Sequence, residues 1–364
     1  MMFNRSVLDS DKEFSELLHP HWQQFEPIEP IYNYLVGAYI GMAGIFGIFG
    51  NLLVIFVFLT SKSLRTLPNA FIVNLAISDF TFSLINGFPL KTIANFNGRW
   101  MWGKDLCTAY AFIGSITGFS SLETNVMMAI DRYLVIAQPS PSLRTMTTTR
   151  LVVMLSIIWS AATAWSVPPL FGYGTFRPEG YQCHCSFDYL SKDFGTYIYI
   201  GIMFIFGFAI NVVIIIFCYM RVVGAIRSHE REMIKMAERL NAGQTGGPSM
   251  KSTDNKADVQ AAKVSILVIT CWLLSWSPYA IVVLISLLGD QKLITPLIAE
   301  LPVNFAKTAA VLNPIIYAMT HPKFRVEIER RFPFLICCCP LKKKGSDGPS
   351  APSGSTVQIR ETAE

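Results

Sequence analysis

Charged residues are scarce in this chain of 364 residues, where Asp, Glu, Lys and Arg together make up 15%. Soluble domains carry about 25%, so the deficit argues against an ordinary soluble protein. Four stretches contain no such residue at all: 30–61, 151–176, 194–220 and 264–289. Each exceeds the roughly 20 residues that cross a bilayer core. Because lipid offers no hydrogen-bond partner to backbone amides, we expect these stretches to be membrane-spanning helices.

The first 30 residues lack two features of a cleavable signal peptide, a basic start and an apolar segment directly after it. We therefore expect a polar tail rather than a leader. Pro20, Pro27 and Pro30 argue against a regular element in this tail. The chain also lacks an internal repeat.

Three further spans are interrupted by isolated charges. They cover residues 68–92 with Asp79, 106–136 with Glu123 and Asp131, and 293–319 with Lys307. Together with the four uncharged stretches they give seven spans, so the two ends of the chain face opposite sides of the membrane. The predicted fold is an all-α membrane protein, a bundle of seven helices.

Basic residues set the orientation of such a bundle, because loops rich in Lys and Arg stay in the cytoplasm. Residues 1–30 have two basic and six acidic residues, whereas 221–263 and the tail from His321 have eight basic residues each. We therefore predict an extracellular N-terminus in the plasma membrane, and a net charge of +5 that reflects topology rather than nucleic-acid binding. The predicted parts are an outer tail (1–30), the bundle (31–320), an amphipathic helix on the lipid surface (321–334) and a cytoplasmic tail (335–364).

Modification sites follow from this topology. Asn4 begins an Asn-Arg-Ser glycosylation sequon on the predicted outer side. Cys107, Cys183 and Cys185 also lie there, where thiols can oxidise. In the cytoplasm disulfides are disfavoured, so lipidation by palmitoylation is predicted for the cluster Cys337, Cys338 and Cys339.

Lys307 is the most unusual isolated charge. It lies about 14 residues from the nearer end of its span, roughly 20 Å at 1.5 Å per residue, which is too far for its side chain to reach water. An ammonium at that depth costs at least about 2.5 kcal/mol. Three compensations are open: an ion pair inside the bundle, a water-filled pathway, or a covalent bond, because a desolvated lysine readily forms a Schiff base with an aldehyde.

Short motifs occur in order along the spans. They are Asn51 in GNLLV, Asp79 in LAISD, Asp131-Arg132-Tyr133 at the end of span three, Trp159 in span four, CWLLSWSPY at 271–279 and NPIIY at 313–317. This set resembles the rhodopsin-like G-protein-coupled receptors over about 300 residues, from Asn33 to Phe334. A single short motif of this kind is weak evidence, whereas the ordered set in the matching spans is specific.

Within that family, a lysine six residues before NPxxY resembles the retinal attachment site of animal opsins. The stretch 178–185, PEGYQCHC, resembles their second outer loop. The stretch 61–80, the long third inner loop and HPKFR at 321–325 are similar to invertebrate rhabdomeric visual opsins, particularly those of arthropods. The resemblance implies a chromophore on Lys307, either 11-cis-retinal or a hydroxylated or dehydro variant.

The resemblance also implies a disulfide between Cys107 and Cys185 and a counterion for the chromophore. A protonated Schiff base in a low-dielectric pocket needs a negative partner to keep its proton. Vertebrate visual opsins have a glutamate three residues after the cysteine of span three, where this chain has Tyr110. Glu179 in the outer loop is the remaining candidate, unless it is an exposed carboxylate. Because a loop carboxylate can stay near both isomers, we expect a bistable, photoreversible product.

Other residues of the expected pocket follow from the same resemblance. Trp276 and Tyr279 belong to CWLLSWSPY, and Trp276 is expected to contact the polyene and report isomerisation to the helix kinked at Pro278. Gly114 replaces the aspartate of amine receptors, which disfavours an amine ligand. Asn86, near the pocket level, tunes colour or bonds between helices, and for Glu123 we favour the interhelical bond.

At the cytoplasmic end, Asp131 and Arg132 can pair, and Asp258 at the start of helix six can reach Arg132 to form a two-state lock. Alternatively, Asp258 is an acid favoured by the helix dipole. Asp79 with Asn51 and Asn313 resembles the polar interior cluster of these receptors, and no metal ligands are assigned. The remaining expected switch residues are Tyr133, Tyr219, Pro314 and Tyr317. Helix five of the family usually has a proline eight residues before this tyrosine, where the chain has Asn211, so its bulge is left open.

The resemblance implies a light-activated receptor rather than an enzyme, coupled to a heterotrimeric G protein of the Gq class. Arrestin and a receptor kinase are expected partners, with Ser346, Ser350, Ser353, Ser355, Thr356 and Thr362 as target sites. A non-signalling retinal photoisomerase and a ligand-activated receptor of the same fold remain alternatives. An ion pump is disfavoured, because it has no use for the Asp-Arg-Tyr and NPxxY motifs.

Overall fold

The computed structural model describes residues 12–336 except 139, 141–144 and 242–251. The side chains of 229, 233, 236–241 and 252–258 are likewise not described. Asn4, the cluster Cys337–Cys339, the serines and threonines of the tail and the side chain of Asp258 therefore lie outside the described residues.

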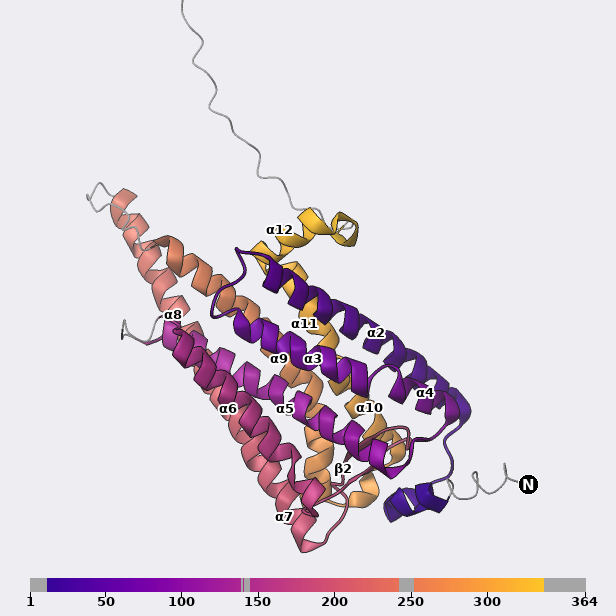
Figure 1. Ribbon diagram of the computed structural model, residues 1–364. Coiled ribbons are helices and arrows are strands. Elements are labelled where there is room, and N and C mark those ends of the chain that lie inside the picture. The colour runs from indigo at the N-terminus through magenta and orange to yellow at the C-terminus, as the bar shows by residue number, and fades with distance from the viewer. Residues whose placement is uncertain (1–11, 139, 141–144, 242–251, 337–364) are drawn as a thin grey trace, which may run out of the picture.

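Long helices packed side by side form a bundle (Figure 1). Their bounds are α2 Pro30–Thr60, α3 Ala70–Asn86, α4 Leu90–Asn97, α5 Gly103–Ile136, α6 Thr148–Ser166, α7 Phe194–Ile202, α8 Ile210–Asn241, α9 Ser252–Leu288, α10 Pro296–Lys307 and α11 Ala309–Thr320. The short helix α12, Pro322–Arg331, lies across one end of the bundle and is followed by the turn η6, Pro333–Ile336.

Five helical segments are long and apolar enough to cross a membrane: Pro30–Thr60, Ala70–Asn97, Thr148–Ser166, Phe194–Glu232 and Val259–Leu288. The other two predicted spans correspond to α5 and to α10 with α11. α5 has 34 residues but buries many polar side chains, including Glu123 and Asp131. α10 and α11 have 12 residues each and are separated at Thr308, directly after Lys307. Five and two make seven spans.

The fifth membrane span consists of α7, α8 and, between them, a π-helical turn, η4, at Met203–Ala209. The bulge left open by the sequence is therefore present without the proline. Asn211 lies directly after this turn, and its Nδ2 donates a hydrogen bond to the Gly207 carbonyl at 3.1 Å. A side chain of α8 thus bonds to a backbone carbonyl inside the irregular turn.

A two-stranded hairpin covers the end of the bundle opposite α12 (Figure 1). β1, Phe176–Pro178, pairs antiparallel with β2, Cys185–Phe187, and Pro178 lies opposite Cys185. A disulfide joins Cys185 to Cys107 in the first turns of α5, as the resemblance implies. The hairpin is therefore fixed over the centre of the bundle.

Part of the N-terminal tail is ordered on this same end, contrary to the sequence prediction. Residues 12–17 are helical, and η1, Pro20–Gln24, forms a short 3₁₀ helix. Trp22 is 2% exposed and packs with Tyr189 and Leu190, while the His21 ring bonds to the Ile294 carbonyl at 2.8 Å. The expectation from the prolines, that this tail contains no regular element, is wrong for residues 12–17 and 20–24, because burial of Trp22 holds a short helical segment in place.

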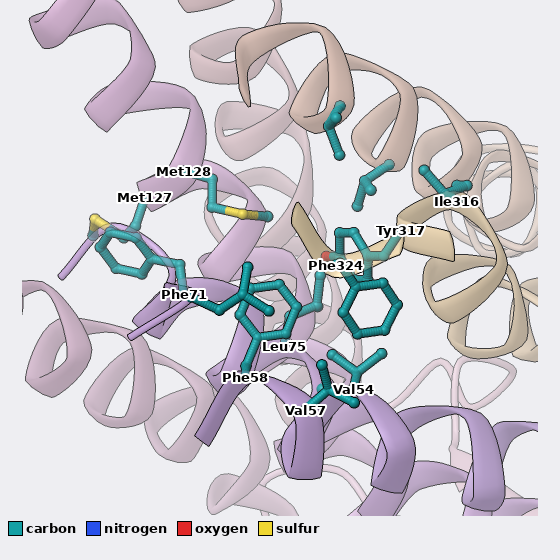
Figure 2. Packing of buried hydrophobic residues seen from close by; sticks show 14 of the residues in the cluster. Val54, Val57, Phe58, Phe71, Leu75, Met127, Met128, Ile316, Tyr317 and Phe324 are labelled. Carbon is teal, nitrogen blue, oxygen red and sulfur yellow. The ribbon is translucent and has the colours of Figure 1, made fainter. Parts of the chain in front are cut away.

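The largest apolar cluster lies at the α12 end, where α12 packs on α2 and α11. Figure 2 shows Phe324 beside Phe58 and Tyr317; the Phe58 and Phe324 rings stack at 5.3 Å. Phe324 and Ile328 are almost fully buried, one helical turn apart on the same face of α12. The predicted amphipathic helix therefore docks through this face on the bundle.

Candidate functional site

Lys307 ends inside the bundle with 8% of its surface exposed. Its Nζ lies 5.1 Å from the centre of the Phe82 ring and 5.7 Å from that of Tyr110. Among the residues that the structure describes, Lys307 Nζ has no carboxylate within the 4.0 Å of an ion pair and no hydrogen bond. An ion pair made directly by Lys307, one of the three open compensations, is thus not observed in this part of the chain.

An apolar cavity lies between α5, the irregular turn η4 and α9. Its walls include Gly114 and Gly118 of α5, Phe187 of β2, and Trp276 and Tyr279 of α9. Lys307 is not part of these walls and instead borders a small void toward α2 and α3. The Phe82 ring is close to both regions, because its centre lies 5.1 Å from the Lys307 Nζ and 6.2 Å from the centre of the Trp276 ring.

Tyr110 and Asn86 connect α5 to the end of α3 beside this lysine. The Tyr110 hydroxyl donates to the Asn86 carbonyl at 3.1 Å, and the Asn86 Nδ2 donates to the Tyr110 carbonyl at 3.4 Å. Gly114 lies one turn further along α5. A Cβ at Gly114 would lie 2.5 Å from the side-chain amide of Asn86, so a larger residue does not fit there without displacing it.

Glu179 lies in the hairpin turn and is 3% exposed, so it is not a solvated loop carboxylate. Its Oε1 is 2.9 Å from Nε2 of His184, whereas its Oε2 is buried without a hydrogen-bond partner among the described residues. Burial raises the pKa of Glu179 to about 7. Burial, followed by the nearby cations Lys91 and Lys307, lowers the pKa of His184 well below its usual range, so this ring is neutral.

Two charged residues that the sequence interpretation overlooked lie beside this turn. Lys91 of α4 and Glu300 of α10 are both fully buried, and their Nζ and Oε1 atoms are 2.8 Å apart. Asn304 completes the pair by accepting from Lys91 at 2.6 Å and donating to Glu300 at 2.8 Å. The sequence did contain a sign of this pair. Lys91 and Glu300 are charges within two predicted spans for which only Asp79 and Lys307 had been noted as charged residues.

At the α12 end, Arg132 and Asp131 form an ion pair with an N–O distance of 2.5 Å. Arg150 at the start of α6 also reaches Asp131, at 3.3 Å. Tyr133 accepts a hydrogen bond from Gln138 at 2.5 Å. The predicted pair of Asp131 and Arg132 is thus present, and Arg150 is a partner that no motif indicated. The predicted contact between Asp258 and Arg132 stays a prediction, because the side chain of Asp258 is not described.

Asp79 is the centre of a polar cluster in the middle of the bundle. Its carboxylate accepts hydrogen bonds from Ser121 at 2.8 Å and Asn313 at 2.7 Å. Asn51 joins the same region through the backbone of α11, donating to the Ala310 carbonyl at 2.9 Å.

The hydroxyls of Tyr219 and Tyr317 are buried and have no partner among the described residues. Pro314 lies within α11.

Glu123 of α5 bonds across to α8 of the fifth span, in agreement with the interhelical bond favoured from sequence. Its Oε1 accepts from Nδ2 of Asn211 at 2.8 Å. The residue that replaces the usual proline therefore links α5 to α8 as well as bonding to its own helix.

Residues 50–317 match the family described as 7 transmembrane receptor (rhodopsin family). The rhodopsin of the octopus Enteroctopus dofleini is 46% identical over 327 residues, which are 90% of this chain and 71% of that protein. A protein of Mizuhopecten yessoensis named "Rhodopsin, GQ-coupled" is 38% identical over 345 residues, 95% of this chain and 68% of that protein. Opsin-1 of Schistocerca gregaria is 35% identical over 362 residues, 99% and 93% of the two chains.

The crystal structure of squid rhodopsin has the same fold, with a TM-score of 0.83 and 44% sequence identity over 90% of this chain and 93% of that one. Both the seven-helix prediction and the resemblance to invertebrate visual opsins are confirmed, and the relatives are molluscan as well as arthropod. The chain is a multi-pass receptor that acts in signalling rather than as an enzyme. It belongs to the rhodopsin family of seven-transmembrane receptors.

Proposed function

We propose that this receptor detects light through retinal bound to Lys307 by a Schiff base. The observation that carries the proposal is the Lys307 amine, which is buried against the rings of Phe82 and Tyr110 without a carboxylate at ion-pair distance among the described residues. Such an amine reacts with an aldehyde to form a Schiff base and release water. Retinal, in its 11-cis form or as a hydroxylated or dehydro variant, would supply light absorption and isomerisation.

The apolar cavity fits a polyene. Gly114 and Gly118 leave space on the α5 wall of the cavity, beside the apolar side chains of that helix, while Trp276 and Tyr279 present ring surfaces on another wall. Polar side chains that would bind an amine or a sugar are few among the walls, where Ser115 and Tyr279 carry hydroxyls. The lining therefore favours a long hydrocarbon over a hydrophilic agonist.

Glu179 is the carboxylate that we assign as counterion of the protonated Schiff base. Its Oε2 is buried and unpartnered among the described residues, and a cation at Lys307 would compensate it. The disulfide and the hairpin register fix the position of this turn. A carboxylate held by the loop, rather than by a moving helix, supports a thermally stable and photoreversible product.

Trp276 would transmit the change of chromophore shape to α9. Its ring stacks on Trp272 at 5.4 Å, and Pro278 lies inside the same helix two residues later. Pro278 removes one backbone hydrogen bond, so α9 can bend at this level. Movement of α9 past α5 is expected to open the closed pair of Asp131 and Arg132 at the opposite end.

We also propose that the disulfide end faces the exterior of the photoreceptor cell and that the α12 end faces the cytoplasm. The Cys107–Cys185 bond supports this orientation independently of loop charge, because disulfides persist in oxidising compartments. The cytoplasmic partner would be a Gq-class G protein, since a relative of 38% identity is named as GQ-coupled.

The test is to express the chain, add 11-cis-retinal and record absorption before and after illumination. We expect a visible band that shifts with light, reverses with a second wavelength, and is absent from Lys307→Ala. Illuminated pigment should accelerate nucleotide exchange on purified Gq. A light-sensitive band without exchange on any G protein would favour the photoisomerase, and a chain that never becomes coloured would favour a ligand-activated receptor.

A further inference from the structure

The buried pair of Lys91 and Glu300 has no role in the proposed function, yet it lies close to the counterion. Both side chains are fully buried, and the pair is saturated by Asn304 and by the backbone N–H of Tyr181, which donates to Glu300 Oε2 at 3.2 Å. Burying two charges is costly and is often no more stabilising than an apolar pair of similar volume. Structural stability alone is therefore a weak reason for these charges.

His184 connects this pair to Glu179. Nε2 of the ring is 2.9 Å from Glu179, and Nδ1 is 3.6 Å from Oε2 of Glu300. The second distance is too long for a hydrogen bond, and Nδ1 has no other partner among the described residues. One neutral imidazole thus lies between two carboxylates, of which only Glu300 has a cation at contact distance.

Glu300 and Lys307 lie on the same helix, seven residues and therefore two turns apart. This spacing puts them on one face of α10 with a rise of roughly 10 Å between them. Two unit charges at that distance still interact in a protein interior, where the effective dielectric constant is about 20. The charge of Glu300 is consequently felt at the Lys307 nitrogen unless Lys91 cancels it.

We propose that Glu300 is a latent second counterion for the cation at Lys307, and that Lys91 silences it by pairing with it. This inference rests on the proposed Schiff base at Lys307. Glu179 then carries the counter-charge alone in the native receptor, because the field of Glu300 is cancelled by an ammonium 2.8 Å away. Lys91 accordingly acts through Glu300. By cancelling the charge of Glu300, it influences the proton affinity and the colour of the chromophore.

The proposal gives each substitution a sign. Lys91→Met unmasks a negative charge and raises the pH at which the visible, protonated pigment converts to its near-ultraviolet form. Glu300→Gln leaves Lys91 as an uncompensated cation and lowers that pH. The double variant removes both charges and restores the native midpoint. The size expected for each single change is about one pH unit, a tenfold change in proton affinity.

The charged groups that face this cluster are Lys91 on α4, Glu179 in the hairpin and Lys307 on α10 itself, and the neutral His184 ring lies between Glu179 and Glu300. Neutral titratable groups are also present, and burial raises the pKa of those in the loop, so they stay neutral in the assay range. They are Tyr181, Cys183 and Tyr189 in the loop, with Tyr110 on α5 and Tyr279 on α9.

The decisive experiment is a pH titration of the absorption spectrum in native and Glu179→Gln pigments. In the Glu179→Gln background, adding Lys91→Met should raise the midpoint by about one pH unit, and adding Glu300→Gln to that variant should cancel the gain. Lys292→Met, an exposed lysine, and Glu123→Gln, a buried carboxylate of another site, are the matched controls and should not move the midpoint. A gain that persists without Glu300 would overturn the proposal.

A second measurement needs no chromophore. In the apo protein, either single variant leaves one charge buried and unpaired, so Lys91→Met and Glu300→Gln should each melt below the double variant. Equal melting of all three would contradict the pairing on which the proposal depends. A native chain that forms no pigment overturns the Schiff base and the latent counterion together, whereas a native pigment with unmoved midpoints overturns only the latent counterion.

Discussion

Gly114 gives the sharpest test of the packing around the proposed chromophore site. Its Cβ position lies 2.5 Å from the Oδ1 and Nδ2 atoms of Asn86 and 2.7 Å from its Cγ, distances at which something must move. Asn86 is 4% exposed and bonds to the Tyr110 carbonyl, so it cannot swing into solvent. Gly118, one turn further along α5, borders the same cavity, but its Cβ would lie 3.5 Å from Trp276, an ordinary contact.

The two glycines therefore form a matched pair. Replacing Gly by Ala inside a helix gains up to about 1 kcal/mol of helix propensity at either position. At Gly114 the forced movement of Asn86 opposes that gain, because overpacking a tight interior costs about 1–3 kcal/mol. Gly114→Ala should thus be less stable than Gly118→Ala by about 1–3 kcal/mol, with the propensity gain cancelled in the comparison.

The assay is thermal unfolding of the two purified apo proteins in the same detergent, followed by tryptophan fluorescence. We expect Gly118→Ala to melt at or slightly above the native temperature and Gly114→Ala to melt several degrees below Gly118→Ala. Gly114→Ala combined with Asn86→Ala should recover part of the loss, because the clashing amide is gone. Equal melting of the two single variants would refute the close approach of α5 to Asn86.

Three further predictions concern Glu179 and Asn211. Glu179→Gln removes the assigned counterion, so the pigment should absorb in the near-ultraviolet at neutral pH, and an unchanged visible maximum would exclude Glu179 from this role. In the apo protein the folded pKa of Glu179, about 7, exceeds the usual 4.5. The stabilisation of the folded state by the protonated Glu179 is therefore complete below pH 4.5 and is lost as the pH rises through 7. Melting followed from pH 4.5 to 8 should therefore reveal a loss of up to about 3 kcal/mol that is absent in Glu179→Gln. Asn211→Leu removes the bonds to Glu123 and Gly207 and should lower stability by about 1 kcal/mol, whereas an unchanged melting temperature would show that neither bond contributes.

The bundle and most of the motif residues could be predicted from sequence because their signals are local. A charge-free stretch longer than a bilayer needs no knowledge of its neighbours, and the family resemblance supplied the order of the spans. The disulfide between Cys107 and Cys185 likewise followed from the resemblance. Lys307 was singled out because it lies too far from either end of its span for its side chain to reach water.

Lys91 and Glu300 escaped notice for the opposite reason. Each is compensated, but by a residue more than two hundred positions away, and the bundle must be folded before the pair is visible. The burial of Trp22 could not be predicted for the same reason, because Tyr189 and Leu190 of its apolar cluster lie in a loop distant in the sequence. Arg150 reaches Asp131 only because α6 begins beside the end of α5. Such contacts depend on tertiary structure, which local pattern and propensity do not contain.

The most direct test of the central claim is to locate the bond to retinal. The pigment is formed with 11-cis-retinal, reduced with borohydride in the dark, digested and mapped by mass spectrometry. A single retinyl adduct on the peptide that contains Lys307 is the predicted result. An adduct on Lys91, the other buried lysine of this region, or on no lysine at all would contradict it.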